Sequence, residues 1–400
     1  MNTKKEKQYM IIQTADRLGG VKEYYFVKKL EEIAKLNKEG KNVISFGIGS
    51  PDLTPSEDTI KALTECAQKP NTHGYQPYRG VPELREKISS WYKKIYAVDL
   101  DPNKEILPLM GSKEGILHIS MAFLNPGDEV LVPNPGYPTY SSLSNLVGAR
   151  IKYYDLTEAN GWYPDMKTLR NSDTSKVKIM WLNYPHMPTG TEVKREVLED
   201  LVAFATEKKI LLCYDNPYSL VLNKKPPLSL LAMPGAKEVA VELNSLSKSH
   251  NMAGWRVGMM LGKEEYLNAA LTVKSNIDSG MFLGIQQAAI KALDNSDEWH
   301  AKRNAIYQER REWIWKILDL LNFEYKKDQV GLFVWAKPKD PITVPDMAKF
   351  VDELLHKTFI FITPGEIFGS NGKPFLRMSL CVPVEKIKEA YGRLEKVLSA

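Results

Sequence analysis

The chain has 400 residues, 43% of them hydrophobic, and its 54 basic and 49 acidic residues give a formal net charge of +5. This apolar fraction excludes a disordered chain, and the length predicts a globular protein of two domains. The positive charge is small and spread along the chain, so the Lys4-Lys5-Glu6-Lys7 start is interpreted as a solvated tail and no nucleic-acid partner is expected.

The cysteines Cys66, Cys213 and Cys381 form no close pair, which suits a reducing compartment and predicts neither a disulfide nor a zinc framework. No signal-peptide stretch opens the chain, and no apolar window approaches the roughly 20 residues of a membrane span. We expect a cytoplasmic protein of bacterial type that has no membrane partner.

The middle of the chain alternates short apolar runs with helical segments. The runs predicted to be strands are Ile106–Met110, Glu129–Pro133, Lys178–Asn183, Ile210–Tyr214, Val239–Leu243 and Val257–Leu261. Continuous apolar runs of this length are typical of strands buried on both faces of a mostly parallel sheet. Between two of them, residues 195–209 carry Val197, Leu201 and Phe204 on one helical face. The alternation predicts an α/β domain.

Beyond about Asp294 the pattern changes. The predicted elements are a helix at Glu298–Leu321, a strand at Leu332–Ala336, a helix at Asp346–Thr358, strands at Phe359–Ile362 and Phe375–Leu380, and a last helix from Glu385. We expect a large domain of residues 45–293 and a smaller α+β domain that combines residues 1–44 with residues 294–400.

Polar residues follow the ends of three predicted strands, at Asn183, Asp215 and the segment Ser245–Lys248. In open α/β sheets, ligands bind beyond the carboxyl ends of the strands, so we expect these residues to meet in one crevice. Asp215 is followed three residues later by Tyr218, and Asn183 precedes a Pro188-Thr189-Gly190 turn. An aspartate before Asn-Pro is also a common turn signal, which is the alternative for Asp215.

Lys248 has a serine three residues before it, Ser245, and an arginine eight residues after it, Arg256. A lysine that forms a Schiff base needs surroundings that disfavour its charge. Hydroxyl groups and the planar fork of arginine suit a phosphate. A lone Ser-x-x-Lys is common and would be compatible with a surface lysine, but the added arginine makes the pattern far more specific.

Taken together, these motifs resemble pyridoxal-phosphate enzymes of fold type I, and more narrowly the class I/II aminotransferases. The segments Gly47–Asp52, Gly74–Gly80 and Gly111–Gly115 are most similar to the branch that holds LL-diaminopimelate and aspartate/aromatic aminotransferases. The resemblance extends from about Tyr24 to Leu398, with the motifs in family order.

The resemblance implies that pyridoxal 5'-phosphate is the cofactor and that Lys248, Asp215 and Tyr218 are catalytic. Lys248 would carry the cofactor as a Schiff base and move the proton at the reacting carbon. Asp215 would keep the ring nitrogen protonated. Tyr218 would donate to the phenolate oxygen, and a packed tyrosine is its alternative.

Further cofactor-binding residues are implied in the same way. The phosphate would lie at a helix start and be held by hydroxyl, backbone N–H and cationic groups. The residues implied for it are Gly111, Ser112, Lys113, Ser245 and Arg256. Tyr137 would stack on the ring, although it could equally be a loop tyrosine. Tyr75 would reach the phosphate of a neighbouring subunit, which implies a homodimer with shared active sites.

Two positions are implied for the substrate. Arg377 would bind its α-carboxylate in a bidentate pair, where an isolated strand arginine would otherwise form a surface salt bridge. The segment Gly47–Gly49 would bring a backbone N–H near the same carboxylate.

Met187 departs from the family pattern, which has an asparagine there that donates to the phenolate oxygen. A thioether has no donor. Three explanations stay open: Asn183 donates instead, His186 does, or Tyr218 serves alone. The remaining histidines show no metal-ligand spacing, and no metal is expected.

The activity implied is amino transfer between an L-amino acid and a 2-oxo acid, with glutamate/2-oxoglutarate as one couple. A C–S β-lyase of the same fold is the alternative. A transcriptional regulator of this fold would need a winged helix before Ser45, for which too few residues precede it. An inactive binding protein has only Met187 in its favour.

The second substrate is left open among aromatic or prephenate-type acids, aspartate and LL-diaminopimelate. The aromatic segment Tyr24-Tyr25-Phe26 would favour an apolar side chain if it covers the substrate, but core packing explains it as well. A dicarboxylate would need a second arginine, for which Arg17 and Arg79 are candidates. We expect a broad enzyme that accepts aromatic and acidic substrates.

Overall fold

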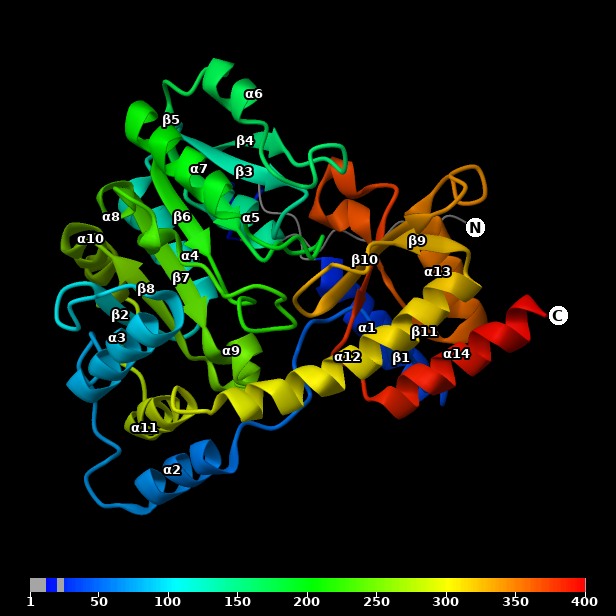
Figure 1. The fold of residues 1–400 in the computed structure, drawn as a ribbon, viewed down its shortest axis with the longest axis horizontal. Coiled ribbons are helices and arrows are strands. Elements are labelled where there is room, and N and C mark those ends of the chain that lie inside the picture. Colours follow the sequence, from blue (N-terminus) through cyan, green and yellow to red (C-terminus); the bar gives the residue numbers. More distant parts are fainter. Residues whose placement is uncertain (1–11, 20–24, 400) are drawn as a thin grey trace.

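The computed structural model describes residues 12–19 and 25–399, and of Phe26 only the backbone. Its largest sheet has seven strands in the order β2-β8-β7-β6-β5-β3-β4 (Figure 1). The strands are β2 (Ile106–Leu109), β3 (Glu129–Asn134), β4 (Arg150–Asp155), β5 (Val177–Asn183), β6 (Leu211–Asp215), β7 (Ala240–Ser245) and β8 (Gly258–Gly262). From β7 to β4 the neighbours run parallel, whereas β8 is antiparallel to both β7 and β2. The prediction of a mostly parallel α/β sheet is confirmed.

Helices cover both faces of this sheet. On one face lie α4 (Ser112–Phe123), α5 (Pro138–Leu146) and α10 (Glu264–Lys274), and on the other lie α3 (Pro82–Tyr96) and α7 (Arg195–Lys208). Successive side chains of a strand point to opposite faces, so a strand that is covered on both sides is apolar at nearly every position. This is why the apolar runs marked the strands to within two residues.

The strand β4 was not predicted. It is an edge strand, paired with β3 alone, and most of its side chains are partly or fully exposed. An edge strand of this kind has no continuous apolar run, so the pattern that found its neighbours does not apply to it.

A second sheet of four antiparallel strands has the order β12-β13-β10-β9, and a parallel pair joins β1 to β11. These strands are β1 (Ile44–Ser45), β9 (Phe323–Tyr325), β10 (Phe333–Pro338), β11 (Ile360–Phe361), β12 (Thr363–Pro364) and β13 (Leu376–Ser379). The prediction of one strand at Phe359–Ile362 is wrong. Phe359 ends the preceding helix in the left-handed conformation, with φ 56°, and the residues after it divide between two sheets.

Three helices around the small sheet lie close to their predicted positions, and they are α12 (Asp297–Leu320), α13 (Met347–Thr358) and α14 (Val384–Leu398). A fourth helix, α1 (Tyr25–Lys38), was not predicted. Ser296 caps α12 by accepting a hydrogen bond from the backbone N–H of Trp299, at 3.2 Å. This long helix leads from the large sheet to the small one (Figure 1).

The remaining helices are shorter or peripheral. They are α2 (Glu57–Gln68), α6 (Met166–Asn171), α8 (Ala236–Val239), α9 (Leu246–Ser249) and α11 (Leu283–Ala292), with 3-10 turns at Asp16–Leu18, Leu230–Ala232, Ala253–Trp255, Gly365–Phe368 and Ser370–Gly372. None of the described helices is long and apolar enough to cross a membrane.

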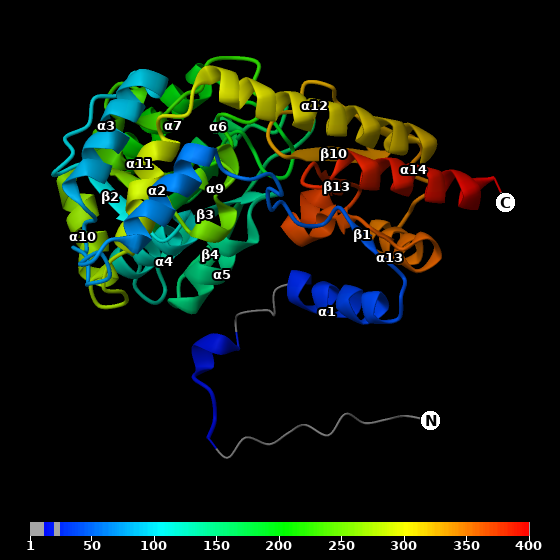
Figure 2. The ribbon, with the colours of Figure 1, turned by 90° about the horizontal axis from the view of Figure 1, so that it is seen from below.

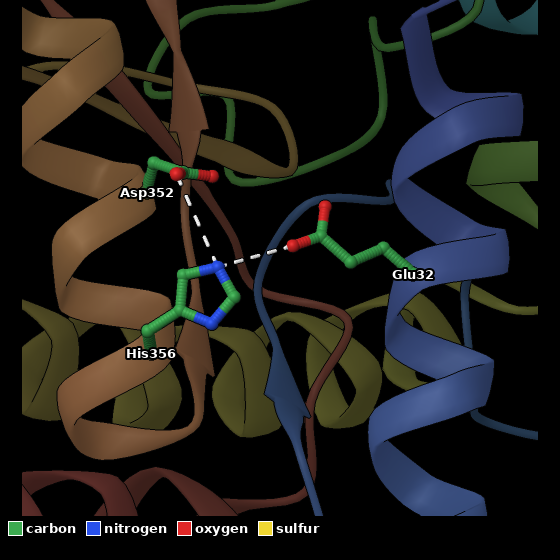
Figure 3. Close-up of side chains that lie close together, drawn as sticks. All are labelled: Glu32, Asp352 and His356. Carbon is green, nitrogen blue, oxygen red and sulfur yellow. Dashed lines mark ion pairs between the residues drawn. The ribbon is translucent and has the colours of Figure 1, made fainter. Parts of the chain in front are cut away.

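Helix α1 lies near α13 (Figure 2), and charged side chains connect the two helices (Figure 3). The ammonium of Lys29 lies 2.8 Å from a carboxylate oxygen of Glu32 and 2.5 Å from one of Asp352. The Nε2 atom of His356 lies 3.2 Å from the other oxygen of Glu32. These contacts place α1, and with it Val27 and Leu30, beside the cavity described next.

Candidate active site

A cavity of about 420 Å³ lies at the carboxyl ends of β5, β6 and β7, with residues of the small sheet as its opposite wall. Most of the predicted site residues line it. These are Gly49, Ser112, Lys113, Tyr137, Asn183, Met187, Asp215, Tyr218, Ser245, Lys248, Arg256 and Arg377. Residues that were far apart in the sequence therefore share one crevice, as the positions of the strand ends predicted.

Lys248 lies on α9, directly after β7, and its ammonium donates a hydrogen bond to the carbonyl of Gly49. Burial lowers the pKa of Lys248, and the cations of Arg377 and Arg256 lower it further. Cys381 and Asp215 act in the opposite direction and raise this pKa in part. The neutral amine that a nucleophilic or basic lysine needs is thus favoured here.

Asp215 ends β6 and is buried. One of its carboxylate oxygens, Oδ2, accepts a hydrogen bond from the hydroxyl of Tyr140 at 2.8 Å. The other, Oδ1, is buried and has no hydrogen-bond partner among the described residues. Burial raises the pKa of Asp215 to about 6, against the lowering effects of Tyr140 and Lys248. A buried carboxylate oxygen without a partner is costly, and the protonated ring nitrogen of pyridoxal phosphate would satisfy it.

The start of α4 has the features of an anion site. Ser112 and Lys113 open the helix, where unpaired backbone N–H groups and the helix dipole favour negative charge. Arg256 reaches the same place so closely that any Cβ on Gly111, which has φ 86°, would overlap its guanidinium. No carboxylate among the described residues forms an ion pair with Arg256, so the cation is free to bind a phosphate.

Ser245 lines the cavity, but its hydroxyl is bonded within the chain. It lies 2.8 Å from the hydroxyl of Ser247 and 3.1 Å from the carbonyl of Val257, and it caps α9. The hydroxyl of Ser247, which was not predicted, lies 3.5 Å from Nη1 of Arg256. The role of Ser245 at the phosphate stays a prediction.

Arg377 projects from β13 between two aromatic rings. The carbon of its guanidinium lies 3.9 Å from the ring centre of Phe333 and 4.6 Å from that of Phe368. Its Nη2 donates to the carbonyl of Gly47 at 2.6 Å. A Cβ on Gly47 would overlap Phe361 and one on Gly49 would overlap Phe333, so glycines allow this segment to approach the site closely. The segment turns carbonyls toward Lys248 and Arg377, and the predicted backbone N–H contact with substrate stays a prediction.

The turn that holds Met187 is fixed by Asn183. The amide of Asn183 donates to the carbonyl of Asp215 at 2.7 Å, and its oxygen accepts from the backbone N–H of Met187 at 2.8 Å. His186 is buried outside the cavity lining, and its Nδ1 lies 2.8 Å from the hydroxyl of Thr189. His186 is therefore not placed to replace the donor that Met187 lacks.

Several residues of the cavity were missed by sequence reasoning. Tyr140 binds Asp215, while Phe333 and Phe368 flank Arg377. Tyr140 follows Tyr137 by one helical turn at the start of α5, a spacing that could have indicated a shared face. Phe333 and Phe368 are ordinary apolar positions in the sequence, and only the fold brings them to Arg377.

Other predicted residues lie elsewhere. Tyr75, on the loop between α2 and α3, is 92% exposed and does not line this cavity. Arg79 donates to Asn268 and to the carbonyl of Asn103, away from the site. Arg17 lies exposed in a 3-10 turn. Tyr24 and the side chain of Phe26 lie outside the described residues.

Among the described residues, two groups of carboxylates and histidine come close together, and a lysine pairs with the carboxylates of each. The first group is Glu32, Asp352 and His356 (Figure 3), and Lys29 pairs with Glu32 and Asp352. The second group is Glu114, His118 and Asp278, and there Lys274 lies 2.5 Å from Asp278 and 3.8 Å from Glu114. In each group a lysine ammonium pairs with both carboxylates, so we interpret both groups as ion-pair networks.

Comparisons with known proteins agree with this geometry. The family model of aminotransferase class I and II matches residues 41–394. An LL-diaminopimelate aminotransferase from Dehalococcoides mccartyi is 38% identical over 384 residues, covering 96% of this chain and 98% of that protein. The structure of BacF from Bacillus subtilis is 35% identical with a TM-score of 0.92, covering 97% of this chain and 98% of BacF.

An aromatic aminotransferase structure from Pyrococcus horikoshii is 27% identical with a TM-score of 0.84, covering 92% of this chain and 98% of that one. Where these names state a reaction, it is amino transfer, and the β-lyase alternative finds no support. The chain belongs to the class I and II aminotransferases, and it is a pyridoxal-phosphate-dependent enzyme that moves an amino group between an amino acid and a 2-oxo acid.

Proposed function

We propose that the cavity holds pyridoxal phosphate with its phosphate at the start of α4 and its ring nitrogen at Asp215. The observation that carries this is the buried, unpartnered Oδ1 of Asp215, which lies in the same cavity as the cations of Lys113 and Arg256. Tyr137 lines the cavity and is assigned to the ring face. When bound, the cofactor supplies a carbon for covalent attachment and a protonated ring that withdraws electrons from the substrate α-carbon.

Lys248 is assigned to attachment and to proton transfer at that α-carbon. Its pKa is lowered mainly by burial, which increases the fraction of neutral amine near neutral pH. A neutral amine can take up the proton and return it to the product. Tyr218, also in the cavity lining, is assigned to donate to the phenolate oxygen alone, without the second donor that an asparagine at position 187 would add.

Arg377 is assigned to the α-carboxylate of both substrates. Its fork can present two parallel N–H groups to a carboxylate. Phe333 and Phe368 hold the plane of the guanidinium and keep water from it, which strengthens a charge-assisted pair. Gly49 lies beside it in the same lining.

For the substrates, we propose glutamate/2-oxoglutarate as one couple and a broad second specificity that includes aromatic and acidic amino acids. The apolar residues Val27, Leu30 and Ile48 line the cavity and would contact an aromatic side chain. Among the described lining residues, Arg256 and Arg377 are the only arginines and both are already assigned, so no arginine is dedicated to a distal carboxylate, which fits a broad enzyme better than a dicarboxylate specialist. The LL-diaminopimelate and aromatic aminotransferases among the relatives fit this range.

The assembly proposed is a cytoplasmic homodimer with shared active sites. A tyrosine that is 92% exposed, as Tyr75 is, has apolar surface to bury against a second subunit. We also propose that residues 45–293 form one domain and that residues 1–44 and 294–400 form the other, which would let the small sheet move against the cavity.

Single-turnover measurements test the proposed function. The holoenzyme is mixed with one amino acid at a time, and the absorption band of the bound cofactor is followed until it bleaches. Phenylalanine and glutamate are expected to bleach it, with aspartate slower. Bleaching by LL-diaminopimelate alone would contradict the proposed breadth, and no bleaching by any donor would contradict the assigned site.

A further inference from the structure

Three residues that adjoin the proposed site residues point away from the cavity. Asn216 follows Asp215, Ser219 follows Tyr218, and Asn244 precedes Ser245. All three are buried, at 0%, 3% and 2% exposure. Asn244 shares its face of β7 with Glu242, because alternate residues of a strand point the same way. On that face lies α3, with Tyr92 and Tyr96.

Glu242 is the centre of a buried hydrogen-bond network. It is 0% exposed, and its carboxylate accepts from four donors. Tyr92 donates to Oε1 at 2.9 Å and Asn216 to the same oxygen at 3.1 Å. Oε2 accepts from the hydroxyl of Ser229 and from the backbone N–H of Leu230.

Asn244 extends this network to Ser245 and, through Tyr96, to Ser219. Its amide donates to the hydroxyls of Tyr92, at 2.9 Å, and Tyr96, at 3.2 Å. Its oxygen accepts from the backbone N–H of Ser245 at 2.7 Å. The hydroxyl of Tyr96 is in turn hydrogen-bonded to that of Ser219. One continuous network thus contacts the neighbours of Asp215, Tyr218 and Ser245.

We infer that Glu242, Tyr92 and Asn244 are positioning residues that fix the ends of β6 and β7, and so the distance between Asp215 and the Lys248 segment. The inference rests on the proposed function, because it concerns the same site. Burying a carboxylate is costly unless its lone pairs are satisfied, and an apolar residue of similar volume often serves stability as well. A charge at this place is best explained by the directional bonds that it makes to two strand ends.

The network acts without touching the cavity. Neither Glu242, Tyr92 nor Asn244 belongs to the cavity lining. Burial raises the pKa of Glu242 to about 7, which shows that the buried carboxylate is costly to desolvate. The hydrogen bonds to it lower the pKa and offset part of this cost.

The test compares Tyr92→Phe and Glu242→Gln with Tyr154→Phe. Each tyrosine variant removes one buried hydroxyl, but that of Tyr154 donates to the carbonyl of Trp181, outside the network. Holoenzymes are measured for kcat, for KM, and for the circular dichroism that the bound cofactor acquires from its surroundings. The affinity of each apoprotein for pyridoxal phosphate is measured beside them.

For Tyr92→Phe and Glu242→Gln we expect kcat to fall about tenfold to hundredfold, since a misplacement of about 1 Å has effects of that size. The cofactor dichroism should change with it, while KM changes less. Tyr154→Phe should keep the wild-type kcat and dichroism even where it lowers the thermal midpoint. If Glu242→Gln fails to fold, the kcat and the cofactor dichroism of Tyr92→Phe alone test the inference.

Wild-type kcat and dichroism in Tyr92→Phe, or an equal loss in Tyr154→Phe, would overturn the inference. Either result would leave the proposed function intact, provided that the wild type transfers amino groups. A wild type that binds the cofactor but transfers no amino group would instead contradict the proposed function.

Discussion

The thioether sulfur of Met187 lies 3.2 Å from Nη1 of Arg377, which donates to it. The family resemblance places an asparagine at position 187, directed to the cofactor. In this chain the side chain instead contacts the arginine assigned to the substrate carboxylate. With the cofactor and substrate placed as proposed, methionine at position 187 lacks a donor for the cofactor and adds a soft, weak acceptor beside the substrate.

Met187→Asn is expected to lower the pKa of the covalent linkage between Lys248 and the cofactor. A hydrogen bond to the ionised phenolate oxygen favours the deprotonated linkage, so restoring the donor shifts the titration to lower pH. A spectrophotometric titration of the bound cofactor measures this. Met187→Leu, which adds no donor, is the control. An unchanged or higher pKa in Met187→Asn would mean that a residue other than Tyr218 already takes the place of the missing donor at that oxygen.

Arg377→Lys is expected to raise KM for the amino donor and the oxo acceptor alike. Lysine keeps the charge but loses the bidentate fork and the flat contact with Phe333. The loss of one charge-assisted hydrogen bond costs roughly 1.5–3 kcal/mol, which is roughly tenfold to hundredfold in KM. Steady-state kinetics in which both substrates are varied measures the two KM values. Arg79→Lys, which changes an arginine outside the cavity, is the control. An effect on one substrate only would rule out a shared carboxylate site.

Tyr140→Phe is expected to move the acid limb of the kcat profile to higher pH. Burial already raises the pKa of Asp215 to about 6, and the hydroxyl of Tyr140 opposes this by stabilising the carboxylate. Without that hydrogen bond the pKa of Asp215 rises further. A hydrogen bond that stabilises the carboxylate by about 1.5 kcal/mol corresponds to about one pKa unit. The pH dependence of kcat for the variant and for Tyr154→Phe measures the shift. If the acid limb stays in place, the hydroxyl does not act on Asp215.

The large sheet could be predicted because its strands are buried on both faces, so that segments such as Leu211–Asp215 are apolar throughout apart from the last residue. The edge strand Arg150–Asp155 could not, since one row of its side chains meets solvent. The antiparallel direction of Gly258–Gly262 has no sequence signal either, because strand direction is set by the connection and not by the composition of the strand.

The site could be predicted where a residue's role depends on its position at a strand end. Asp215 ends one strand and Lys248 follows the neighbouring strand, so topology alone brings them together. Tyr140 and Phe333 could not be assigned, because each acts through a neighbour that is distant in the sequence. Tyr75 is exposed, and its predicted contact depends on a second subunit.

Glu242 should make the stability of the apoprotein depend on pH. Burial raises the pKa of its carboxyl to about 7 in the folded state, against about 4.3 in an unfolded chain. The folded state therefore binds the proton more tightly, and the free energy of unfolding falls by roughly 2–4 kcal/mol as pH rises through this window.

Urea unfolding of the apoprotein at about pH 5 and about pH 8 measures the change, with Glu242→Gln as the comparison because glutamine does not titrate there. Asp215 contributes equally to both proteins and cancels in the difference. The variant should lose less stability than the wild type between the two pH values. Equal losses would show that Glu242 does not change its protonation in this range.

The most direct test of the assigned site is the identity of the lysine that holds the cofactor. The holoenzyme is reduced with borohydride, digested, and mapped for the pyridoxyl label. The label is expected on the peptide containing Lys248, and Lys248→Ala should bind pyridoxal phosphate without covalent attachment and lose turnover almost entirely. A label on Lys113 or on any other lysine would contradict the site built around Asp215, Arg256 and Arg377.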